Sequence, residues 1–173
     1  RGASVDMISA KLNVTKGSFY HHNDNKEDLI SDCFERTFSV IRRALTLAES
    51  IEGKGWDRAC AISRSLARFQ LSSEGPLLRL GATSALSDPE RRSEVRRTMS
   101  RLTERLAGVV VDGMMDGSIR PLHPVIAAQV ASGLVNSAGS LSHWAPAATQ
   151  DNVAEIYVRP IFLGILCPPS KAA

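Results

Sequence analysis

The chain has 173 residues, of which 43% are hydrophobic and 5% aromatic, and its net charge is +3. Such a low aromatic content favours packed helices over sheets, because strands collect aromatic and β-branched side chains. The longest apolar stretch, residues 161–167, is much shorter than the roughly 20 residues that cross a bilayer, so we expect no membrane partner. Cys33, Cys60 and Cys167 have no metal-ligand spacing, which predicts reduced thiols, a cytoplasmic location, and neither a metal nor a cofactor.

Two short helices are predicted at the beginning of the chain. Ser4 can cap the first, over residues 5–12, whose apolar side chains recur at helical spacing. Asn13 ends this helix, and Thr15 can cap a second one that extends to His22. Two short helices joined by a turn of this length indicate a helix-turn-helix.

The second of these helices has an outer face suited to DNA. Phe19 is its inward anchor, and the remaining side chains are small, polar or hydroxyl-bearing, so they can reach base edges and phosphates in a major groove. Lys26, at the start of the next helix, adds an ammonium group next to free backbone N–H groups. The predicted DNA-binding residues are Thr15, Lys16, Gly17, Ser18, Tyr20, His21, His22 and Lys26.

Longer helices are predicted in the rest of the chain. Asn25 can cap a helix over residues 26–49, and Asp88-Pro89 is a strong start signal for a long one. Pro160 lies inside the last predicted helix, where we expect a kink. After the helix at 26–49, the predicted helices cover residues 56–71, a short segment from Pro76, 89–115, 124–144 and 152–166.

Residues 4–30 resemble the DNA-binding segment of the tetracycline-repressor family. The matching positions are Val5, Ile8, Ala10, Val14, Thr15, Lys16, Gly17, Ser18, Tyr20, His22, Lys26, Glu27 and Leu29. Two positions depart from the family pattern: Asn13 stands where glycine is usual, and Asn23 stands where phenylalanine is usual. The family places a further helix before Arg1, so the DNA-binding module is expected to be incomplete here.

The resemblance implies an all-α fold in two parts. Residues 1–35 would form the helix-turn-helix DNA-binding module, without its first helix, and residues 36–173 a helical ligand-binding and dimerisation domain. The implied function is that of a transcriptional regulator, a repressor rather than an enzyme. A small molecule would release it, as a homodimer, from a near-palindromic double-stranded DNA operator.

The C-terminal part is expected to hold both the ligand and the dimer contacts. The effector should be largely apolar, because the candidate cavity residues are mostly apolar or adaptable. These candidates are Phe69, Leu78, Leu80, Met99, Leu102, Leu106, His143 and Trp144. Small side chains on the helix from Pro124 allow close approach of a partner helix. The candidate dimer residues are Ala128, Ala131, Val135, Ile156 and Ile161.

Two alternatives remain open at this point. The chain could be a ligand-binding helical module without DNA-binding activity. Asn23, which stands where the family usually has phenylalanine, is consistent with this alternative. An all-α enzyme is the weaker alternative, because the sequence has no nucleophile–base pair, metal spacing or glycine-rich phosphate loop. The arginines between 91 and 105 are interleaved with glutamates, which indicates a solvated helix face rather than a second DNA surface.

Overall fold

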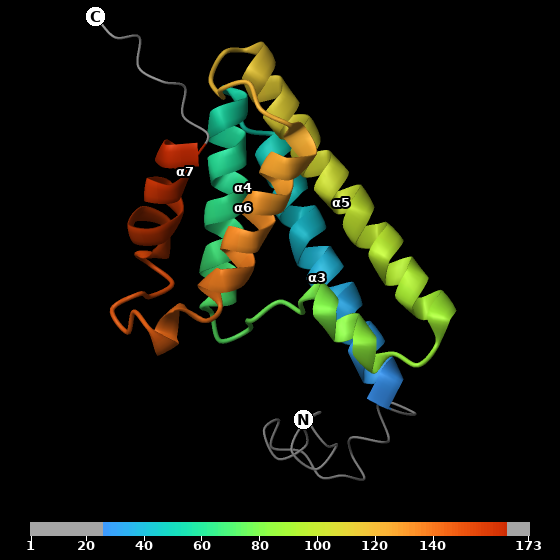
Figure 1. Ribbon diagram of the computed structural model, residues 1–173. Helices are drawn as coiled ribbons and strands as arrows, with labels where there is room; N and C mark the ends of the chain where they lie inside the picture. Colours follow the sequence, from blue (N-terminus) through green and yellow to red (C-terminus); the bar gives the residue numbers. More distant parts are fainter. Residues whose placement is uncertain (1–25, 166–173) are drawn as a thin grey trace, which may run out of the picture.

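The computed structural model describes residues 26–165, and in that range it contains helices and no strand (Figure 1). This confirms the all-α prediction for the described part of the chain. The two predicted helices of the helix-turn-helix, over residues 5–12 and 16–22, lie outside the described residues. So do all the predicted DNA-binding residues except Lys26.

The first described helix, α3, spans Lys26–Glu49, as the sequence predicts. Glu27 and Asp28 occupy its first turn, where carboxylates interact favourably with the helix dipole. Its apolar stripe is deeply buried through Phe34, Phe38 and Leu45. The predicted domain boundary between residues 35 and 36 falls inside α3, so both predicted domains share this one rigid helix.

Three further long helices pack with α3 into a bundle: α4 (Gly55–Gln70), α5 (Pro89–Met115) and α6 (Pro124–Ala138). The start of α5 follows its sequence signal, because the Asp88 carboxylate accepts a hydrogen bond from Glu90 N at 2.8 Å and Pro89 occupies the first turn. The bounds of α5 agree with the prediction, and those of α4 differ by one residue at each end.

The shorter elements differ from the predictions. No helix starts at Pro76; residues 76–79 are extended and lead into a 3-10 turn, η1 (Leu80–Ala85). Helix α6 ends at Ala138 rather than near residue 144, and the chain continues into η2 (Leu141–His143).

The predicted kink at Pro160 takes the form of a wide helical turn. A π-helical turn, η3 (Ala154–Val158), precedes the short helix α7 (Arg159–Ile165). Proline has no N–H, and its ring clashes with the carbonyl four residues earlier, which here is Ile156 within η3. A π turn accommodates such a break in the regular hydrogen-bond ladder.

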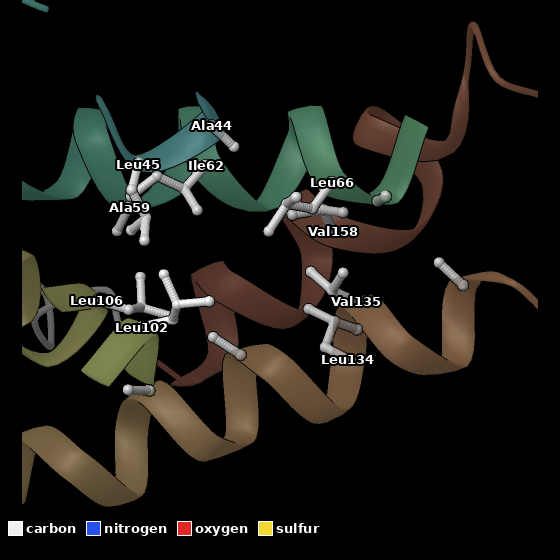
Figure 2. Packing of buried hydrophobic residues seen from close by; sticks show 14 of the residues in the cluster. Ala44, Leu45, Ala59, Ile62, Leu66, Leu102, Leu106, Leu134, Val135 and Val158 are labelled. Atoms are coloured by element: carbon white, nitrogen blue, oxygen red, sulfur yellow. The ribbon is translucent and has the colours of Figure 1, made fainter. Parts of the chain in front are cut away.

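The core lies between the four long helices, and α7 packs beside α4 (Figure 1). The rings of Trp56 on α4 and Phe162 on α7 are 6.2 Å apart. Figure 2 shows leucines and isoleucine of α3 and α4 pointing across the bundle toward the side chains of α5 and α6. None of the helices within residues 26–165 has both the length and the hydropathy that crossing a membrane requires.

Candidate ligand site

A cavity of about 50 Å³ lies inside the bundle, between α3, α4, α5 and α6. Its wall is mostly aliphatic, and in Figure 2 two of the lining side chains, Leu45 and Ile62, point toward two others, Leu102 and Leu106. None of the described residues that line it is ionisable. The lining residues are Thr37, Ile41, Leu45, Ile62, Ser63, Leu66, Leu77, Leu78, Met99, Leu102, Thr103, Leu106, Ala131, Ser132, Val135 and Asn136.

The structure brings four of the predicted ligand residues together on this wall: Leu78, Met99, Leu102 and Leu106. These residues come from α5 and from the extended segment before η1, which packs across the bundle. Periodicity alone placed the three α5 side chains on one face, and the fold adds Leu78 from a distant part of the chain.

The other predicted ligand residues do not reach the cavity. Phe69 lies at the end of α4, where the Arg36 guanidinium packs over its ring at 5.7 Å. Because α6 ends at Ala138, the segment that follows turns away from the bundle, and His143 and Trp144 are exposed, the latter by 67%. Leu80 is also exposed, at the start of η1.

Sequence reasoning missed the part of the wall contributed by α3, α4 and α6. Ile41 and Leu45 belong to the apolar stripe recognised on α3, but a stripe does not show which of its members border an empty space. The polar members of the wall gave no signal, since single serines and threonines within apolar stripes are common.

The hydroxyl groups on the cavity wall differ in their hydrogen bonding. Three of them donate to the carbonyl oxygen four residues earlier in their own helix. These bonds are Thr37 to Cys33 O at 2.9 Å, Thr103 to Met99 O at 3.0 Å and Ser132 to Ala128 O at 2.8 Å. Ser63, on α4, makes no hydrogen bond within the described part of the chain, although it is only 1% exposed.

The N-terminus of α3 is tied to the beginning of α5. The Glu27 carboxylate accepts hydrogen bonds from the backbone N–H of Ser87, at 2.8 Å, and from the Ser87 hydroxyl. Asp28 forms an ion pair with Arg91 at 2.8 Å, and this carboxylate raises the pKa of the Arg91 guanidinium. The first turn of α3, which includes Lys26, is therefore held by side chains at the start of α5.

The predicted dimer residues fall into two groups. Ala128, Ala131 and Val135 are buried inside their own protomer, because they form the face of α6 that packs on α4 and α5. They are therefore not available to a partner helix in this conformation. Ile156 is 52% exposed and Ile161 is half-buried. The apolar side chains that α6 and α7 expose are Val125, Ile126, Val130 and Leu163.

Metal binding was not predicted, and within residues 26–165 no group of three or more histidine, cysteine, aspartate or glutamate side chains is placed to hold a metal ion.

Comparisons with known proteins bear on both parts of the chain. Residues 1–33 match the family model described as "Bacterial regulatory proteins, tetR family". The transposon Tn10 TetC protein of Escherichia coli is 39% identical over 56 residues, which are 32% of this chain and 28% of TetC. The chain thus matches less than a third of that relative's length.

Solved structures extend the likeness over nearly the whole chain. AibR in complex with isovaleryl coenzyme A and operator DNA has a TM-score of 0.74 at 21% identity, over 97% of this chain and 89% of AibR. The ketosteroid regulator KstR2 of Mycobacterium tuberculosis also has a TM-score of 0.74, at 14% identity over 96% of this chain and 86% of KstR2. A regulator from Saccharomonospora viridis in complex with choline has a TM-score of 0.65, at 16% identity over 96% of this chain and 88% of that one.

These structural likenesses show that the chain has the all-helical fold of this class of bacterial regulators. Residues 1–33 resemble the tetR family of bacterial regulatory proteins, and the chain as a whole shares the fold of these solved structures.

Proposed function

We propose that the chain is a transcriptional repressor that a small molecule releases from a DNA operator. One observation carries the proposal above the others. Helix α3 begins inside the family-matching segment, residues 1–33, and forms one wall of the cavity through Thr37, Ile41 and Leu45. One helix thus links the predicted DNA-binding module, residues 1–35, with the cavity. No catalytic step is part of this function, and the protein would act in the cytoplasm, where the DNA is.

The small size of the cavity suggests how a ligand would be sensed. About 50 Å³ is well below the roughly 150 Å³ of an engineered cavity that binds benzene. An effector larger than a few heavy atoms therefore has to push the cavity wall outward. Movement of α3 against α5 would strain the contacts of Glu27 with Ser87 and of Asp28 with Arg91. The displaced first turn of α3 would shift the recognition helix, and by linkage the operator must weaken ligand binding by the same factor.

The proposed effector is small and largely apolar, because the cavity wall is mostly aliphatic. AibR and the Saccharomonospora viridis regulator were each solved with a small molecule, isovaleryl coenzyme A and choline respectively. Those ligands differ widely in chemistry, so the cavity of this chain, rather than its relatives, guides the choice of effector class.

The proposed DNA contacts remain those predicted from the sequence. Lys16, Gly17, Ser18 and His21 would face bases or backbone, with Thr15 at the helix start. Tyr20 and Lys26 would grip phosphates, with His22 nearby. In a homodimer, two such helices would enter successive major grooves of a near-palindromic operator, about 34–36 Å apart.

We propose that the homodimer forms through the exposed apolar side chains of α6 and the last helix rather than through Ala128, Ala131 and Val135. Ile126 is 61% exposed on α6, and an Ile126→Lys substitution would place a charge in that interface. We expect this variant to be monomeric by sedimentation at concentrations where the wild type is dimeric. A matched Gln129→Lys variant, also exposed on α6, tests whether added charge alone is responsible; a dimeric Ile126→Lys protein would contradict the assignment.

The function is tested by DNA binding of the full-length protein. DNA from the region upstream of its own gene would be footprinted and then titrated with wild type, Lys16→Ala, Tyr20→Ala and the control Lys54→Ala, a lysine exposed at the far end of the bundle. Loss of one base or phosphate contact should weaken operator binding by about tenfold or more. The control should bind like wild type.

Two results would contradict the proposal. Unchanged affinity and sequence preference in Lys16→Ala and Tyr20→Ala would show that the predicted helix at residues 16–22 does not read the operator. A protein that binds apolar molecules in the cavity but no operator would be the helical ligand-binding module without DNA-binding activity, an outcome that Asn23 in place of the usual phenylalanine favours.

A further inference from the structure

Ser63 differs from the other hydroxyl residues of the cavity wall. Thr37, Thr103 and Ser132 have already donated their hydroxyl protons to their own helices. Ser63 has the same choice, because its helix offers the carbonyl of Ala59 one turn earlier, but it makes no such bond. Its proton is therefore the one unused hydroxyl proton among the described residues of the cavity wall.

Burial makes this unused proton significant. Ser63 is 1% exposed and lines the cavity, so its side chain has almost no contact with the solvent outside the protein. A buried polar group without a partner is unfavourable, and native proteins rarely keep one without a reason. Asn136 also lines the cavity, but it is only half-buried, so water can form hydrogen bonds with its side-chain amide.

We propose that the Ser63 hydroxyl donates a hydrogen bond to the effector, and that the effector is a neutral molecule with a compact apolar body and a carbonyl oxygen. This inference rests on the proposed function of the cavity. The aliphatic wall suits the apolar body. A charged group is disfavoured, because no described wall residue is ionisable and an unpaired buried charge is costly.

Three probes with the same branched skeleton separate the chemistries. They are 3-methylbutan-2-one, which has the carbonyl; 2,3-dimethylbut-1-ene, in which a methylene replaces the oxygen; and 2-methylpropanoate, which carries a charge. Binding would be followed in the full-length protein through the ¹³C-methyl resonance of Met99, which lines the cavity, with the exposed Met115 as an internal control. Wild type, Ser63→Ala and Ser132→Ala would be compared. Ser132→Ala is a matched control, because it removes a wall hydroxyl whose proton is already used.

The expected result is a change in preference rather than a loss of all binding. One neutral hydrogen bond corresponds to about fivefold in affinity, so Ser63→Ala should weaken the ketone about fivefold relative to the alkene. Ser132→Ala should leave the ratio of the two affinities unchanged, and the carboxylate should bind most weakly to all three proteins.

Several outcomes overturn the inference. If Ser63→Ala and Ser132→Ala have equal effects, or if the carboxylate binds more tightly than the ketone, Ser63 does not select a carbonyl, while alkene binding would leave the proposed apolar cavity standing. If the Met99 methyl resonance does not move with any probe, the cavity holds water at most, and both the inference and the ligand half of the proposed function fail.

Discussion

Helices α4 and α5 pack against each other in two very different ways along their length. Where α4 begins and α5 ends, the two backbones touch: a Cβ atom added to Gly55 would lie 2.2 Å from Gly113 N. Toward the other end, the same two helices separate enough to border the cavity, with Ile62 and Leu66 facing Met99 and Leu102.

The closed end is also held by hydrogen bonds, whereas among the described residues no hydrogen bond joins α4 to α5 at the cavity end. Asp116 accepts from Gly55 N at 2.7 Å, the Ser118 hydroxyl accepts from Trp56 N at 3.1 Å, and Arg58 pairs with Asp112 at 3.1 Å. The cavity end is held by aliphatic contacts, which tolerate small displacements because they are not directional. We therefore expect the start of α4 and the end of α5 to stay fixed, as a corner of the bundle, while the helices around the cavity move apart to admit a ligand.

The largest expected effect comes from breaking the closed end. In Gly55→Ala the new methyl group would meet the backbone of Gly113 and of Val109, and neither can move without shifting a helix. We expect the free energy of unfolding to fall by at least about 3 kcal/mol. Urea denaturation at fixed protein concentration measures this. A loss below about 1 kcal/mol would show that the corner is not fixed.

A smaller effect is expected from truncating a side chain at the open end. Leu102→Ala should cost about 2–3 kcal/mol, at the low end for a buried leucine, because its side chain already borders an empty space and has fewer contacts to lose. Leu86→Ala is the matched control, since Leu86 is also a buried core leucine but does not line the cavity. If Leu102→Ala is the more destabilising of the two, the open end is packed as tightly as the rest of the core.

The cavity end of the α4–α5 pair can be predicted from the sequence better than the closed end. The Leu102 and Leu106 stripe follows from helical periodicity, and α3 and α5 were predicted with the correct bounds because their first residues carry clear start signals. The glycine crossing was not predicted, because a glycine near a helix start or end has many uses. Its role depends on which distant backbone comes near, and only the fold supplies that. The same reason explains Ser63, whose importance depends on a hydrogen bond that it does not make.

Asp116 makes the stability of the closed end depend on pH. The Ser118 hydroxyl and then the Gly55 N–H donate to this carboxylate and lower its pKa below the ordinary 3.8. A carboxylate with a lowered folded-state pKa stabilises the fold above the unfolded-state pKa, and this contribution is lost as the pH falls through the folded-state pKa. Between pH 6 and pH 2.5, the urea midpoint of Asp116→Asn should therefore fall less than that of the wild type.

A second variant ties this pH dependence to its cause. Ser118→Ala removes the hydroxyl that contributes most to the shift, so the carboxylate pKa of Asp116, followed by NMR, should rise toward its ordinary value. An unchanged pKa would mean that the backbone N–H groups of Gly55 and Ser118, which both donate to Asp116, hold the carboxylate in its charged form.

The smallest expected effect has the opposite sign and uses a glycine on the same helix as Gly113. Gly108, on α5, would place an added Cβ in open space, with no atom within 4 Å. Gly108→Ala should therefore stabilise the protein by about 0.5–1 kcal/mol, because alanine restricts the unfolded chain and favours the helix. Measured beside Gly55→Ala, it separates the general effect of adding a methyl group from the effect of the crossing. If Gly108→Ala also destabilises the protein, then α5 does not accept an added methyl group at Gly108, although the structure leaves space for one there.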